Sequence, residues 1–597
     1  LVYGLMDRMK IFKTDSQFTK QLNDPAKILL YQYGASENRA PDVLNYNLYN
    51  NFNNGYIALT ESASRNQTIT TITTINYNNQ FGLHNISALA LAETREFKTN
   101  GLGGTGFGLP FISLDELQFI SNSTFDGKEK LPTITGSSSK SRVAGFAGRI
   151  NYNYDERYFV EASVRHDGSY LFGGMNKRWV TLPGVSLGWR IDRENFFTAD
   201  WVDNLKLRGG FGQTATSGIS PFYWRNTMAL NKNGVVIGGS TGPYISASIL
   251  GNPTLTWSKT DNYNIGFDAS LWHGLLGIEF DVFYKYQYDI LTYNTGAWPP
   301  SMGGFHYSSA NLDKNDYKGF DLTFTHRNRV GDFSYGAKLI WSYAYGRYLF
   351  VASDSDNKPE YQRLTGKQIG SKYGFIANGL FQTQEQIDNA PFPENVTNKT
   401  LYLGDIRYVD RNGDGKITYD GDMGYVGKSN MPTHTGSLNL FANWRGFDLD
   451  VLFSWGLGHD VALTGQYTAV GSEGVMDHTS YTLPFKWYGN SPVYLVENSW
   501  TPEHTDAEFP RLCATPRSNN NAYSSTFWYK NGNYLRMKSF AVGYTIPEKI
   551  TAKAGISRLR VFAEGYNLFT LSGLSKFNID PEAPAVNNGY YPQQRKM

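Results

Sequence analysis

An acidic stretch of the chain carries the residue types and spacing of a metal-binding loop. It reads Asp410-Arg411-Asn412-Gly413-Asp414-Gly415-Lys416-Ile417. Oxygen-bearing side chains stand at alternate positions, and Gly415 follows them where a calcium loop of the EF-hand kind makes its sharp turn. Lys416 would add its backbone carbonyl. This spacing predicts that Asp410, Asn412, Asp414 and Lys416 bind a hard cation, Ca²⁺ or Mg²⁺.

The sequence does not define the closing ligand of this loop. The twelfth position, which holds a bidentate acid in an EF-hand, is Gly421, and the acids Asp420 and Asp422 flank it. Both are therefore candidate metal ligands. The alternative is an Asx-rich turn that keeps its shape without metal, through hydrogen bonds from backbone amides to its own side chains.

Patterns that would indicate an enzyme are weak. Gly101, Gly103 and Gly106 satisfy G-x-G-x-x-G, but a dinucleotide site needs a strand before this motif and a helix after it. The polar residues before it and the proline after it favour a flexible loop. The nine His residues are scattered, and no G-x-S-x-G elbow occurs. Glu279 and Asp281 could form a paired-carboxylate glycosidase site, yet polar residues lining a channel explain them as well. We therefore expect no catalytic residues.

Two tryptophans are candidate substrate-binding residues. Trp224 and Trp298, the second followed by two prolines, fall in polar segments that we expect to be loops. Exposed aromatic rings offer an apolar face on which sugar rings can stack. Packing within the loops is the alternative for both residues.

The elements that would position these residues are strands. Between residues 276 and 290 one face carries apolar or aromatic residues throughout: Leu276, Ile278, Phe280, Val282, Tyr284, Tyr286, Tyr288 and Ile290. The residues between them are mostly polar, and a period of two excludes a helix. The same alternation occurs in residues 185–191, 263–271, 438–444 and 447–456, and Trp272-His273-Gly274 joins two of these strands as a tight hairpin turn.

Strand length favours a sheet that crosses a membrane. Strands of soluble sheets run about five or six residues, whereas crossing a bilayer with a tilted strand takes about nine to eleven, and the alternation here lasts that long or longer. Aromatic residues cluster at the ends of the expected strands, as at Tyr284, Tyr286 and Tyr288. Outer-membrane barrels carry girdles of aromatic residues at these positions. A long-stranded soluble β protein is the alternative.

Composition excludes several other classes. Lys and Arg number 55 against 53 Asp and Glu, which argues against a nucleic-acid binder. The single cysteine, Cys513, excludes a disulfide scaffold and a Cys-based zinc cluster within this chain. No apolar run reaches the roughly 18 residues that indicate a transmembrane helix. The absence of such a run does not exclude a transmembrane strand, because only every second residue of such a strand faces lipid.

Polar segments rich in Gly, Asn, Ser and Pro separate the strands, at residues 100–139, 215–250, 347–432 and 458–529. Short turns on one side and long loops on the other are typical of outer-membrane barrels. Within one of these segments, Thr383 followed by Gln386 makes a capping-box pattern. We interpret it as a helical turn in a surface loop.

Motifs spread over residues 145–597 resemble a known family, the SusC/RagA-type TonB-dependent outer-membrane transporters of Gram-negative bacteria. They follow the family's order along the chain: residues 148–154, 165–169, 182–190, 252–257, 264–268, 404–415, 500–503, 509–511, 533–536, 543–547, 567–569, 580–582 and 591–592. Residues 404–415 include both the family's Gly-Asp-Ile and the acidic loop described above. The resemblance covers most of the chain beyond residue 145.

The resemblance implies an all-β fold, a large antiparallel transmembrane β-barrel with long extracellular loops. The resemblance implies a monomeric barrel of about 22 antiparallel strands, a size whose lumen is plugged, and in this family an amino-terminal domain forms the plug. A SusD-like surface lipoprotein caps the barrel, and the TonB complex of the inner membrane pulls on the plug to admit a large nutrient. The acidic loop would then lie on the extracellular side.

We expect residues 1–597 to be a partial barrel. The family's plug, its TonB-contacting segment, the first strands and the last strand are not recognisable in this sequence. A barrel cannot stay open in hydrocarbon, because its edge strands would leave backbone groups unpaired. We therefore expect those parts to belong to the intact protein.

The sequence thus predicts an importer of large nutrients, oligosaccharides in the first place, in the outer membrane of a Gram-negative bacterium. Its expected partners are the SusD-like lipoprotein, the TonB complex through the plug, the substrate and membrane lipid, but not nucleic acid. An oligopeptide importer of the same family is one alternative. A calcium-dependent glycan-binding or glycan-degrading β protein at the cell surface is another.

Overall fold

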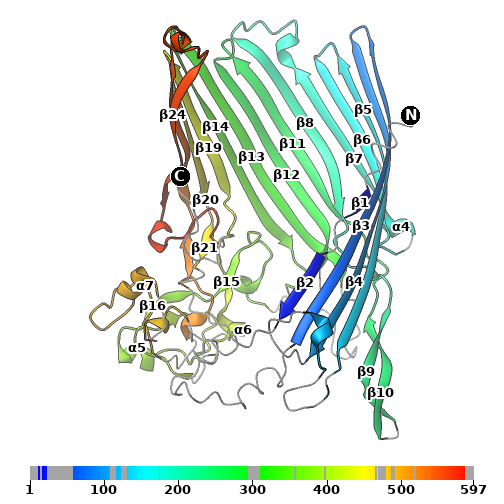
Figure 1. The fold of residues 1–597 in the computed structure, drawn as a ribbon, viewed down its shortest axis with the longest axis vertical. Helices are drawn as coiled ribbons and strands as arrows, with labels where there is room; N and C mark the ends of the chain where they lie inside the picture. Colours follow the sequence, from blue (N-terminus) through cyan, green and yellow to red (C-terminus); the bar gives the residue numbers. More distant parts are fainter. Residues whose placement is uncertain are drawn as a thin grey trace.

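One antiparallel sheet of 16 strands dominates the computed structural model of the chain. The structure describes residues 11–13, 17–22, 58–107, 116–122, 129, 131–173, 175–237, 239–292, 309–354, 358–395, 399–463, 467, 479–485, 491–514 and 520–584. The strand order is β1-β3-β4-β5-β6-β7-β8-β11-β12-β13-β14-β19-β20-β23-β24, and β2 also pairs with β3. From β3 to β24, the strands of this sheet follow one another in chain order, which is an up-and-down order, and the strands that are skipped lie in the long connections (Figure 1).

The strands of this sheet are long. The longest, β3 and β4, have 24 residues each, well beyond the roughly nine to eleven that a tilted strand needs to cross a bilayer. Their bounds are β1 (Ile11–Lys13), β2 (Gln17–Leu22), β3 (Ala58–Phe81), β4 (His84–Phe107), β5 (Thr133–Tyr154), β6 (Tyr158–Ser169), β7 (Trp179–Arg190), β8 (Val202–Thr216), β11 (Ser258–Leu271), β12 (Leu276–Thr292), β13 (Ala310–Val330), β14 (Phe333–Phe350), β19 (His434–Trp444), β20 (Phe447–Leu457), β23 (Tyr534–Ile546) and β24 (Leu559–Ser572).

Register places the apolar positions of successive strands side by side. Phe267 of β11 stands opposite Phe280 of β12, and Phe280 stands opposite Leu322 of β13. The predicted turn between β11 and β12 is confirmed. Trp272 and His273 have φ of 54° and 57°, the left-handed region that such turns require.

The long connections lie beyond one end of the sheet and the short turns at the other (Figure 1). The long connections carry the hairpin β9 (Thr227–Ile237) and β10 (Ser240–Ile249), and the short strands β15 (Lys372–Gly374), β16 (Ala377–Leu380), β17 (Ile406–Tyr408), β18 (Gly424–Gly427), β21 (Asp460–Ala462) and β22 (Tyr529–Asn531). The helices are α4 (Met175–Arg178), α5 (Gln384–Asp388), α6 (Tyr419–Asp422), α7 (Val493–Glu497) and α8 (Glu548–Thr551). Within the part of the chain described here, no helix is long and apolar enough to cross a membrane.

Two predicted loops are partly strand. The G-x-G-x-x-G glycines lie within β4, so the interpretation of that motif as a flexible loop is wrong. The pairing of β4 with β3 and β5 continues in register past Gly101 and Gly103, which face Ser64 and Ser62. Cross-strand hydrogen bonds from both sides outweigh the low strand propensity of glycine. The segment 215–250 likewise contains the β9–β10 hairpin.

The predicted capping box is confirmed. Thr383 precedes α5, and its hydroxyl accepts a hydrogen bond from the Gln386 amide at 3.3 Å. The Gln386 side chain in turn accepts from the amide of Gln382 at 2.8 Å. Because α5 is a single short helix in a long connection, the interpretation as a helical turn in a loop holds.

Candidate functional site

The outward face of the large sheet is apolar and uncovered. Ile265 is 69% exposed and Val282 43% exposed. Ile278 and Phe280 lie on the same face and are half-buried among its other side chains. None of these four residues belongs to either buried cluster of the described residues. The soluble alternative is therefore wrong, because it needs these side chains packed in a dry core, whereas a transmembrane barrel turns them to lipid.

The opposite face of the same strands carries charges that pair across strands. Arg208 of β8 reaches Asp268 of β11 at 2.9 Å and Asp281 of β12 at 2.5 Å. Arg560 of β24 pairs with Asp448 of β20 at 2.6 Å. A hollow of about 500 Å³ on this face is lined in part by Asn85, Ser87, Asn151, Glu161, Ser186, Lys206 and Asn264. A face of this composition suits the wet interior of a transport barrel.

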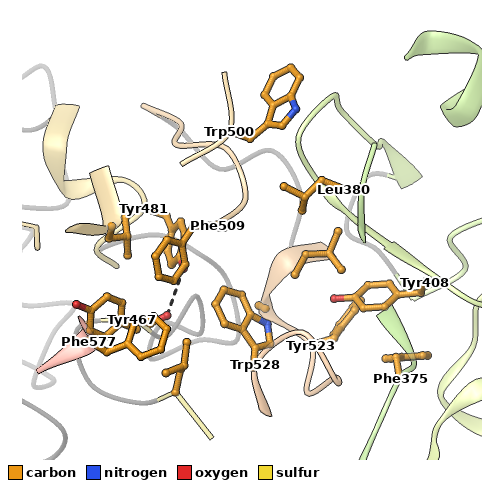
Figure 2. Packing of buried hydrophobic residues seen from close by; sticks show 14 of the residues in the cluster. Phe375, Leu380, Tyr408, Tyr467, Tyr481, Trp500, Phe509, Tyr523, Trp528 and Phe577 are labelled. Atoms are coloured by element: carbon orange, nitrogen blue, oxygen red, sulfur yellow. Dashed lines mark hydrogen bonds between the residues drawn. The ribbon is translucent and has the colours of Figure 1, made fainter. Parts of the chain in front are cut away.

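Long connections far apart in the sequence fold together into one unit, which we call the loop domain and define as the described residues of 351–433, 458–533 and 573–584. Its core is largely aromatic, and Figure 2 shows rings from these segments packed against one another. The fully buried side chains of this core include Phe375, Ile406, Tyr467, Tyr481, Leu495, Phe509 and Leu574. The loop domain is thus a packed body with its own core, and it lies beyond the end of the sheet that bears the long connections (Figure 1).

Residues of the family motifs join the segments of this loop domain through buried contacts. Asp405 is fully buried and accepts hydrogen bonds from Arg511 at 2.9 Å and from Asn521 at 3.0 Å. Gly404 has φ of +80°, and a Cβ added there would lie 2.5 Å from the ring of Trp500. The position thus requires glycine for two reasons, its backbone conformation and the close approach of the indole.

The acidic loop is part of the loop domain and is held by its own backbone. Asp410 accepts from the amides of Gly413 at 2.7 Å and Gly415 at 2.8 Å. Asp414 accepts from the amide of Lys416 at 2.8 Å and from the Asn412 side chain at 2.9 Å. The side chains of Asp410 and Asp414 thus hold one turn together through its backbone amides and the Asn412 side chain.

The two acids that flank position 421 have different environments. Asp422 is fully buried at the end of α6, and its two oxygens accept from the amides of Arg411 and Thr418, both at 2.7 Å. Asp420 is exposed, and its backbone carbonyl accepts from the Gln362 side chain at 2.6 Å. Buried Ile417 anchors the turn in the core of the loop domain.

The donor set has the chemistry that hard cations prefer, since it consists of carboxylate, amide and carbonyl oxygens. Among the described residues, however, no group of three or more His, Cys, Asp or Glu side chains is arranged to hold a metal ion. The backbone amides already hold the loop in shape, as the metal-free alternative expects. Metal binding by this loop stays a prediction.

Of the two candidate tryptophans, one can be placed. Trp224 lies half-buried before β9, with its ring against Gly173, where an added Cβ would come within 2.4 Å of it. Its indole Nε1 is buried and has no hydrogen-bond partner among the described residues. Trp298 lies outside the described residues.

Burial perturbs several titratable groups of the loop domain. Burial lowers the pKa of His459, which is only 2% exposed. Desolvation also lowers the pKa of the Lys530 ammonium, while the nearby Glu508 opposes this shift. The buried hydroxyl of Tyr467 has its pKa raised to about 12 by the same effect.

Sequence reasoning did not find the ion cluster that ties β23 to the segment after β24. Arg536 is 1% exposed and pairs with Asp580 and Glu582, while Lys538 reaches Glu582 at 2.8 Å. Both Arg536 and Asp580 occur in the motifs that carry the family resemblance. That shared occurrence was the only signal in the sequence, because partners separated by more than forty residues leave no local pattern.

The family described as "TonB dependent receptor-like, beta-barrel" matches residues 11–568. TonB-dependent receptor P26 of Formosa agariphila is 25% identical over 551 residues, which cover 88% of this chain and 52% of that protein. TonB-dependent receptor SusC of Bacteroides thetaiotaomicron is 25% identical over 487 residues, 78% of this chain and 44% of that protein. The chain thus spans about half the length of the curated relatives that it matches.

Solved structures share the fold. The RagAB peptide transporter superposes with a TM-score of 0.64 at 22% identity, covering 88% of this chain and 54% of that one. The RagAB peptide importer in its open-open state gives a TM-score of 0.66 at the same identity, covering 88% and 53%. The relatives are receptors and transporters of the outer membrane rather than enzymes. The chain therefore belongs to the TonB-dependent receptor-like β-barrel family, and it is of the SusC/RagA type.

Proposed function

We propose that the chain forms the barrel wall and extracellular loops of a TonB-energised importer of large nutrients. The carrying observation is the contrast between the two faces of one continuous sheet. Ile265 and Val282 lie uncovered on one face, while Arg208 is paired with Asp268 and Asp281 on the other. A barrel wall with an apolar outer face and a polar inner face can enclose a water-filled channel through the lipid bilayer.

Energised import is tested by uptake in cells that produce the intact protein. A strain that lacks it should fail to take up its substrate, and the gene in trans should restore uptake. Restored uptake should stop when TonB is deleted. Uptake that continues at the same rate without TonB would contradict energised import and indicate a passive pore.

Oligosaccharides are the first substrate class that we propose. A polar inner face with amides, hydroxyls and paired charges, such as Asn151, Ser186 and Asn264, offers hydrogen bonds to sugar hydroxyls. Oligopeptides are the second class, supported by the fold shared with the RagAB peptide transporter. Growth of the complemented strain on defined oligosaccharides or on defined oligopeptides as the sole carbon source separates the two classes.

A SusD-like surface lipoprotein is the partner that we propose for the loop domain. A lid protein needs a firm surface to close on, and the aromatic core of the loop domain provides one. Affinity purification of the tagged, intact transporter from membranes should recover a lipoprotein in equal amount. Cross-links from that lipoprotein to barrel turns at the opposite end of the sheet, instead of to the loop domain, would contradict this arrangement.

We also propose that the acidic loop binds Ca²⁺. The side chains of Asp410, Asn412 and Asp414 lie on one turn. Each carboxylate oxygen accepts one hydrogen bond, from a backbone amide or from the Asn412 side chain, and retains a lone pair for a cation. Such a cation would stiffen a loop-domain segment rather than take part in chemistry. The test of this site is given with the predictions in the Discussion.

A further inference from the structure

Three cations meet at one carboxylate close to the middle of β4 and β5. Glu96 accepts from Arg142 at 2.6 Å, from Lys98 at 3.0 Å and from Lys140 at 3.1 Å. The three basic side chains are 62%, 43% and 41% exposed, in that order. One carboxylate balances one of them, so the cluster keeps two net positive charges on an accessible surface.

This cluster lies on the outward face of the sheet. The pairing of β4 with β5 runs from His84 to Thr105 without a register shift, so the face on which a residue lies follows from its parity alone. Glu96 and Lys98 share a face with Ala88, Ala90 and Ala92 of β4. Lys140 and Arg142 share it with Phe146 and Ile150 of β5, which are 54% and 56% exposed.

The order of residues along this face follows the layers of a membrane. Ile150 lies in the apolar band. Phe146 comes next, stacked on Trp179 with ring centroids 6.2 Å apart, and rings of this kind mark the interface in outer-membrane barrels. Arg142 and Lys140 follow, toward the end that bears the long loops. The cations therefore stand at the level of lipid headgroups in the outer leaflet.

A shallow apolar hollow of about 520 Å³ lies further along the same strands, on the side of the short turns. Its middle is formed by small residues, Ala88, Ala90 and Gly148, while Ile75 and Val164 rise on either side. Ala90 precedes Glu96 by six residues in β4, about 20 Å at the usual rise of a strand. An acyl chain that hangs from a headgroup at Glu96 would run along β4 into this hollow.

We propose that Lys98, Lys140 and Arg142 bind the phosphate group of an outer-leaflet lipid whose acyl chain lies in the hollow over Ala90 and Gly148. Clustered Lys and Arg at a membrane surface attract anionic headgroups, and a phosphate can accept hydrogen bonds from several cations at once. Glu96 holds the three side chains together. The lipid supplies the negative charges that Glu96 alone does not.

The test uses the whole transporter, extracted from membranes in detergent, with dioleoyl phosphatidic acid as the probe and native mass spectrometry as the readout. Lys140→Gln with Arg142→Gln removes two cations and should weaken binding about 25-fold, that is about fivefold for each cation. Arg95→Gln is the matched control. Arg95 lies in β4 on the opposite face, is 54% exposed and pairs with Glu93, so its loss should leave lipid binding unchanged.

A second variant leaves the charges alone. A Cβ at Gly148 would meet only Val164, at 4.0 Å, so Gly148→Val should fold normally and fill the hollow. It should weaken binding of the dioleoyl lipid but not that of a short-chain phosphatidic acid.

Equal binding by the wild type and the double variant would overturn the proposal, and so would an equal loss in Arg95→Gln. Displacement of the lipid by an equal concentration of inorganic phosphate would also overturn it, because the site would then recognise free phosphate rather than a lipid.

Discussion

A charge placed on the outward face of the sheet should destabilise the protein far more than the same charge placed on the inward face. Phe280 lies midway between the hairpin turn at Trp272 and the tyrosines that begin at Tyr284, so we expect it near the middle of the bilayer. An Arg or Lys at that depth costs about 2–4 kcal/mol. The ring of Phe280 also lies 6.0 Å from those of Phe267 and Phe320, and losing such contacts costs about 0.5–1.5 kcal/mol.

Phe280→Arg should therefore lower the free energy of unfolding by about 2.5–5.5 kcal/mol in total. Two further variants separate the contributions. Phe280→Leu keeps the position apolar and should show the loss of ring contacts alone. Thr323→Arg places the same charge at the same depth but on the inward face, where Thr323 stands opposite Glu279. It should change stability by no more than about 0.5 kcal/mol.

The assay is reversible unfolding in urea of protein reconstituted in lipid vesicles, followed by tryptophan fluorescence. The comparison between Phe280→Arg and Thr323→Arg decides the outcome, since both add one arginine to neighbouring strands. If the two variants lose the same stability, the outward face does not meet hydrocarbon, and the assignment of the two faces is refuted.

Three further predictions concern the inward face and the loop domain. Arg208→Gln leaves two carboxylates facing each other on the partly exposed inward face and should cost about 1 kcal/mol; adding Asp281→Asn should recover part of this loss in a double-mutant cycle. If the acidic loop binds Ca²⁺, a chelator should speed proteolysis of the loop in the wild type but not in Asp414→Ala. Asp422→Asn should speed proteolysis with or without Ca²⁺, because buried Asp422 accepts hydrogen bonds from two backbone amides. Equal proteolysis of the wild type with and without chelator would refute metal binding. Burial lowers the pKa of His459, so the folded state favours the neutral ring, and the loop domain should lose stability as pH falls below the usual histidine value of about 6.5. Amide protection factors of the loop domain, corrected for the intrinsic exchange rate at each pH, should therefore decrease on acidification. His459→Phe should remove this decrease, and an unchanged decrease in that variant would contradict the assignment.

Some elements could be predicted because their signal is local. The alternation from Leu276 onward gives β12 and its outward face, and the turn at Trp272 follows from three residues. The capping pair Thr383 and Gln386 likewise acts within a single turn.

Other elements could not be predicted because their stability comes from distant partners. The sequence predicts a loop at glycines 101, 103 and 106, yet these residues lie within β4, because β3 and β5 pair with its two edges. The loop domain has no periodic pattern of its own, and its aromatic core joins segments that are more than a hundred residues apart. The buried contacts of Asp405 with Arg511 and Asn521 have no local signature.

The sequence by itself determined the strands, their apolar and polar faces and therefore the family's barrel wall, because alternation with a period of two is a property of neighbouring residues. Only the tertiary structure decided which charges meet, such as Glu96 with its three cations and Arg536 with Asp580. It also decided that the polar connections fold into a domain with a core. Those contacts join segments that lie far apart in the sequence. They form only once the strands have paired in register and the long connections have packed together, so no local pattern predicts them.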